Sequence, residues 1–78
     1  MTAAELVQLH GAALVGRIVK TVAMGAWPGG LAVVIELSID PSTPSTSFRV
    51  KHQDMEVHKR LDSDTIGVFE WETVELMP

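Results

Sequence analysis

The chain has 78 residues, no cysteine and a formal net charge of −4. At this length we expect a single domain over residues 1–78 with a small, marginal core, and without cysteine neither a disulfide nor a thiolate zinc site can support it. The acidic balance disfavours nucleic acid as a partner. The sequence shows no basic, signal-like start and no apolar run of about 20 residues, so we expect a cytoplasmic protein without a membrane span.

The first expected element is a short helix over residues 2–10. Thr2 and Glu5 have the spacing of a capping box, in which each side chain accepts a hydrogen bond from the backbone of the other residue. An apolar stripe at helical spacing follows, made of Ala3, Leu6, Val7 and His10. Gly11 ends the pattern. Two turns are too few to be stable alone, so the helix is expected to pack on another element.

Two strands joined as a hairpin are expected next, over residues 13–24 and 31–39. Both runs are rich in β-branched residues, and the segment GAWPGG between them favours a tight connection. Alternate positions of a strand share one face. In the second run we assign the odd-numbered positions to the core: Leu31, Val33, Ile35, Leu37 and Ile39.

The opposite face of these strands is apolar as well. Its residues are Val15, Val19, Ala23 and Val34. Such a face is covered either by the N-terminal helix or by a second subunit, and the sequence leaves both alternatives open. Because the helix offers only Leu6 and Val7 for this purpose, we predict a homo-oligomer, most simply a two-fold dimer, with the outer-face residues and these two helix residues in its interface.

Four potential metal ligands are spaced two positions apart in the segment RVKHQDMEVHKR: His52, Asp54, Glu56 and His58. On one straight strand they would share a face, but Val50 and Val57 would then point in opposite directions. A turn at residues 53–54 repairs this mismatch by pairing Val50 with Val57 across a hairpin. In that hairpin His52 and His58 lie on opposite faces, so we expect neither a metal nor a cofactor.

The remaining segments offer one exposed-looking aromatic and two short strands. Trp27, before Pro28, is expected in a loop, either as a lid on the end of the fold or as an anchor for a partner. A strand at residues 66–68, a single turn at 69–72 and a last strand at 74–76 complete the chain. No nucleophile elbow or carboxylate pair is visible, so we predict no catalytic residue.

The strand rhythm resembles the SH3-like small barrel of about five strands. The resemblance covers residues 13–77 and rests on the motifs Gly16-Arg17-Ile18-Val19, Gly30-Leu31-Ala32-Val33, Ile66-Gly67-Val68-Phe69 and Thr73-Val74-Glu75-Leu76. Among such barrels the type II plasmid dihydrofolate reductases are similar in rhythm, and their pore motif is Val-Gln-Ile-Tyr. This chain has Ile66-Gly67-Val68-Phe69 there. The resemblance therefore implies a mainly β barrel that oligomerises, but no reductase activity.

Three functions remain open at this stage, because fold analogy does not separate them. The first is a non-catalytic interaction or regulatory module that self-associates and binds protein, and we favour it over an enzyme. The second is a small oligomeric enzyme or ligand-binding barrel whose site forms between subunits. The third is a nucleic-acid-binding barrel, which would require the basic residues to gather on one face: Arg17, Lys20, Arg49, Lys51, Lys59 and Arg60.

Overall fold

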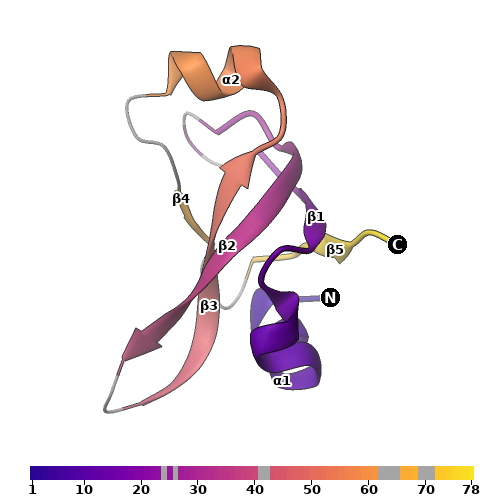
Figure 1. Cartoon of the computed structure of the whole chain (residues 1–78), viewed down its shortest axis with the longest axis vertical. Helices are drawn as coiled ribbons and strands as arrows, with labels where there is room; N and C mark the ends of the chain where they lie inside the picture. The colour runs from indigo at the N-terminus through magenta and orange to yellow at the C-terminus, as the bar shows by residue number, and fades with distance from the viewer. Residues whose placement is uncertain (24, 26, 41–42, 62–65, 69–71) are drawn as a thin grey trace.

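A computed structural model describes residues 1–23, 25, 27–40, 43–61, 66–68 and 72–78 (Figure 1). The elements follow in the order α1 (Ala3–His10), a 3₁₀ turn η1 (Gly11–Leu14), β1 (Ile18–Thr21), β2 (Gly30–Asp40), β3 (Thr43–His52), α2 (Met55–Arg60), β4 (Ile66–Val68) and β5 (Glu75–Leu76). Neither described helix is long and apolar enough to cross a membrane.

The strands form one five-stranded sheet in the order β4-β3-β2-β1-β5, with every neighbouring pair antiparallel. The predicted mainly β class with a helix at the N-terminus is therefore confirmed. Closure into a barrel is not shown, because no pairing joins β4 to β5 within the described strands. Strands β4 and β5 lie at the two ends of the described strand order, and the position of α1 decides which of the two sheet faces becomes the core.

Helix α1 begins with the predicted capping box. The Thr2 hydroxyl accepts from the Glu5 backbone N–H at 3.2 Å, and the Thr2 backbone N–H donates to the Glu5 carboxylate at 3.1 Å. The helix ends at Gly11, whose φ of 52° lies in the left-handed region that glycine adopts most easily. Its buried face packs on the sheet and contacts β3 (Figure 1).

The predicted core face of β2 is wrong, since the even-numbered positions are the buried ones. Ala32 and Val34 are 0% and 1% exposed, whereas Leu31 and Ile35 are 43% and 37% exposed. A bulge between Val34 and Glu36 then shifts the alternation by one residue. Leu37, an odd-numbered residue of the predicted core, therefore packs against the core. The side chain of Ile39 lies outside the described residues.

The predicted hairpin over residues 49–60 is also wrong, because the second half of this segment is the helix α2. Asp54 is its N-cap, and its carboxylate accepts from the Glu56 backbone N–H at 2.9 Å. An acidic residue in the first turn and basic residues in the last turn suit the helix dipole. Val50 and Val57 do not fit one straight strand because the first lies in a strand and the second in a helix, where apolar residues recur at a different spacing.

Candidate interaction surfaces

The layer between α1 and the sheet contains most of the residues that the sequence assigned to a subunit interface. Val19, Val34 and Leu6 are 0%, 1% and 1% exposed, and Val7 is also buried. Their placement on an outer face is wrong, because α1 and the sheet bury them against each other within one chain. Of the predicted interface, only Val15 and Ala23 remain exposed. The alternative that the helix covers the second apolar face is the one that the structure shows.

Trp27 is 3% exposed and belongs to the core. Its indole Nε1 donates to the Thr21 hydroxyl at 2.7 Å, and that hydroxyl donates to the Gly30 carbonyl at 2.8 Å. The indole thus closes one end of the core, with its N–H satisfied as buried tryptophans require. The reading of Trp27 as a surface anchor is therefore wrong, since a partner would find almost no exposed area on it.

His52 ends β3 and is 7% exposed. Its Nδ1 accepts from the Asp54 backbone N–H at 2.9 Å, so Nε2 carries the proton that is donated to the Gly29 carbonyl at 2.8 Å. The ring also lies 4.8 Å from the Trp27 ring, at an angle of 60°. Both ring nitrogens of His52 are therefore hydrogen-bonded to the backbone. The His52 side chain connects the start of α2 to the segment between β1 and β2.

The two histidines considered for a metal lie on different elements. His52 is at the end of β3, and His58 lies in α2, where it is half-buried. Within the residues that the structure describes, no three His, Asp or Glu side chains come close enough to hold a metal ion.

The face of the sheet opposite α1 is open, and its centre is apolar. Leu31 and Ile35 are exposed on β2, Val33 between them is half-buried, and Ile18 of β1 lies beside Val33. We call these residues, Ile18, Leu31, Val33 and Ile35, the open-face stripe. They are three of the five odd-numbered residues that the sequence assigned to the core, Leu31, Val33 and Ile35, together with their neighbour Ile18 on β1.

Charged residues of both signs surround the open-face stripe. Lys20 is paired in register with Glu75, and Lys51 with Val33. The Arg49 guanidinium lies 3.1 Å from the Glu36 carboxylate, with both side chains more than half exposed. The other basic residues lie elsewhere: Arg17 donates to the Met77 carbonyl, and Lys59 and Arg60 belong to α2. The described basic residues thus lie on more than one part of the fold, and carboxylates accompany those around the open-face stripe.

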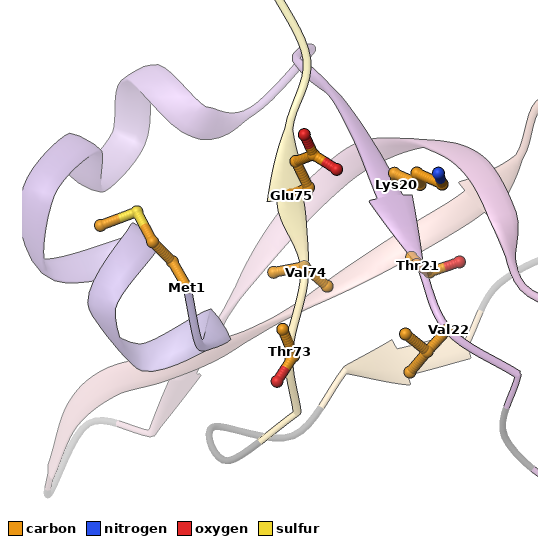
Figure 2. A pocket seen from close by; sticks show the side chains of 7 residues that line it. All are labelled: Met1, Lys20, Thr21, Val22, Thr73, Val74 and Glu75. Carbon is orange, nitrogen blue, oxygen red and sulfur yellow. The ribbon is translucent and has the colours of Figure 1, made fainter.

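Two of the pockets that described residues line lie beside the sheet. The larger, of about 320 Å³, lies between the end of β1 and the segment leading into β5 (Figure 2). Its walls are Met1, Lys20, Thr21, Val22, Thr73, Val74 and Glu75. The smaller, of about 230 Å³, lies against α2 and is lined by Pro28, Val57, Arg60 and Leu61. The sequence indicated neither, because each joins residues from separate parts of the chain.

The sequence did not predict the hydrogen bonds around Trp27 and His52, but two neighbouring glycines are a local signal of the close packing there. Gly29 has a φ of 81° and would place a Cβ 3.0 Å from the Ala23 nitrogen, while a Cβ on Gly30 would contact the His52 ring at 3.4 Å. The glycine doublet therefore marks a close approach and not merely a turn.

No family model, curated protein or solved structure matches this chain.

Proposed function

We propose that the protein is a non-catalytic interaction module that self-associates through the open-face stripe. The observation that carries the proposal is the exposure of Leu31 and Ile35, at 43% and 37%, at the centre of an uncovered sheet face. Helix α1 covers only one face of the sheet, and contiguous apolar area on the other face is typical of interaction sites.

A second copy of the chain is the partner that the charges favour. In a two-fold interface the same patch meets itself. The patch carries Lys20 and Lys51 as well as the carboxylates of Glu36 and Glu75, so the lysines of one copy can face the carboxylates of the other. A mixed rim of this kind supports pairing with itself better than pairing with a strongly charged partner.

The dimer is expected to be weak. A standard interface takes about 800 Å² from each partner, close to one sixth of the chain's 4910 Å² of accessible surface. Leu31 and Ile35 already have more than half of their area buried, so each contributes about 1 kcal/mol on docking instead of the 1.5 to 3 kcal/mol of a fully buried side chain. Micromolar dissociation is therefore expected, rather than nanomolar.

Sedimentation and light scattering over a concentration series test this proposal. The mass of the wild-type protein should rise from one chain toward two between about 10 and 500 µM. Val33→Lys should stay folded and remain at the mass of one chain, because it places a charge at the centre of the stripe. Leu9→Lys is the matched control, since Leu9 is 65% exposed on α1, and this variant should follow the wild type.

Two results would contradict the proposal. One is a wild-type mass of a single chain at the highest concentration. The other is identical association of the Val33→Lys and Leu9→Lys variants.

A further inference from the structure

The strands β1 and β5 begin as a regular antiparallel pair and then separate. Val19 pairs with Leu76 and Lys20 with Glu75, and the Met77 backbone N–H donates to the Ile18 carbonyl at 3.0 Å. Backbone groups of alternate residues point to the same side of a strand. The next pair of this ladder would therefore join Val22 to Thr73, but no hydrogen bond connects these two residues.

The other side of the segment before β5 is already occupied by the N-terminus. The Val74 N–H donates to the Met1 carbonyl at 2.8 Å, and the Ala3 N–H donates to the Glu72 carbonyl at 2.9 Å. These two bonds flank the bridge between Thr2 and Thr73. In an antiparallel ladder, a residue between two such bonds turns its own N–H and C=O away from that partner. The backbone groups of Thr73 therefore point toward Val22.

The larger pocket lies in the gap where the ladder stops. Figure 2 shows Lys20 opposite Glu75 at one end, and Val22 opposite Thr73 at the other, where the two segments diverge. Val22 is 50% exposed, so the wide end is open to solvent. With Val74 and Met1 also in its walls, the pocket combines apolar surface with the Thr73 hydroxyl and with the backbone groups of the interrupted ladder.

We propose that this gap binds a short extended peptide segment of a partner protein, which enters beside Val22 and Thr73 and continues the interrupted ladder. An extended main chain carries alternating N–H and C=O groups. These can form hydrogen bonds with the backbone groups of Val22 on one wall and of Thr73 on the other. The volume of about 320 Å³ is at the small end of ligand sites and suits a few residues with small side chains. The paired residues Lys20 and Glu75 close the inner end.

The open end of the site is formed by Val22 and Thr73, which lie outside the open-face stripe, whereas Lys20 and Glu75 belong both to the rim of that stripe and to the inner end of the pocket. The two proposals also have different readouts. Self-association changes the solution mass, whereas peptide binding changes the amide signals of Val22 and Thr73. Either can therefore fail while the other holds.

An amide NMR titration with the blocked tripeptide acetyl-Thr-Val-Thr-amide tests the site. This probe has high strand propensity and no charge. We expect its addition to shift the amide signals of Val22 and Thr73 and to slow their exchange with solvent, with saturation near about 1 mM. The amides of Leu31 and Val33 should not move. Absence of shifts at Val22 and Thr73 up to about 10 mM would overturn the proposal.

Two controls separate main-chain pairing from simple apolar contact. The same tripeptide carrying an N-methyl group on its valine lacks one donor and should bind about tenfold more weakly. On the protein, Val22→Pro removes the N–H and should weaken binding similarly, whereas Val22→Ala keeps the N–H and should bind within about threefold of the wild type. Equal binding of the methylated and unmethylated peptides would show that no ladder forms, and this result does not depend on the Pro variant folding.

Discussion

The two faces of β2 differ in burial although both are apolar. Val34 on the inner face is 1% exposed, whereas Leu31 on the open face is 43% exposed. The strand itself does not cause this difference, because apolar residues occur at both parities, with Ala32 and Val34 on one face and Leu31, Val33 and Ile35 on the other. The cause is α1, which packs on only one face of the sheet. A strand without polar alternation thus leaves the choice of core to whatever element covers it.

The largest difference between the two faces is expected when the same charge is placed on each. Val34→Asp should unfold the protein, because a carboxylate buried without a partner costs more than the roughly 5 kcal/mol that a domain of this size has available. Val33→Asp should change the free energy of unfolding by less than about 1 kcal/mol, since its side chain can reach water. Urea unfolding followed by circular dichroism measures both. Equal loss of stability would mean that both faces are buried.

Neighbouring residues at the end of β3 provide a second comparison. His52 points inward and hydrogen bonds with Gly29 and Asp54, whereas Lys51 points outward. His52→Ala should cost about 2 to 3 kcal/mol, because it removes the partner of the Gly29 carbonyl and of the Asp54 N–H. Lys51→Ala should stay within about 0.5 kcal/mol of the wild type. Chemical denaturation checks this, and a His52→Ala protein as stable as Lys51→Ala would show that those hydrogen bonds contribute nothing.

The smallest expected effect concerns helix α1, which covers the inner face of the sheet. Hydrogen bonds from the Thr2 backbone N–H, and then from its hydroxyl, hold the pKa of Glu5 below its ordinary value. A carboxyl group whose pKa is lowered by folding stabilises the folded state at pH values above its ordinary pKa. This stabilisation is lost as the pH falls through the pKa of the group in the folded protein. The melting temperature should therefore fall slightly more in the wild type than in Glu5→Gln below pH 4.5, the ordinary value for this group. Parallel pH profiles of the two proteins would contradict this contribution.

The local signals near the N-terminus predicted structure well. Thr2 and Glu5 predicted the capping box, and Gly11 predicted the end of the helix, because these interactions involve residues within one turn of each other. The β-branched runs likewise predicted a mainly β fold with β1 and β2 antiparallel. The segment of α2 also carries a local helix signal, since Asp54 as N-cap with basic residues in the last turn is a helix pattern.

The candidate surfaces were much less predictable than the elements. Trp27 and His52 are far apart in the sequence, yet their rings lie 4.8 Å apart, and only the folded chain shows that neither is available at the surface. The gap between Val22 and Thr73 depends on where a ladder between two distant segments stops. Sequence periodicity contains no information on such an end point.

The class of the fold, the N-terminal helix with its caps and the absence of any disulfide follow from composition or from neighbours along the chain, so the amino-acid sequence is enough to predict them. The face of β2 that forms the core depends on contacts between distant segments. Alternation allowed both parities, and the bulge after Val34 brings Leu37 to the same side as Val34. The helix resolves this ambiguity by burying Leu6 and Val7 on the even-numbered face. The residues first taken for the core, Leu31, Val33 and Ile35, thereby become the proposed interaction surface.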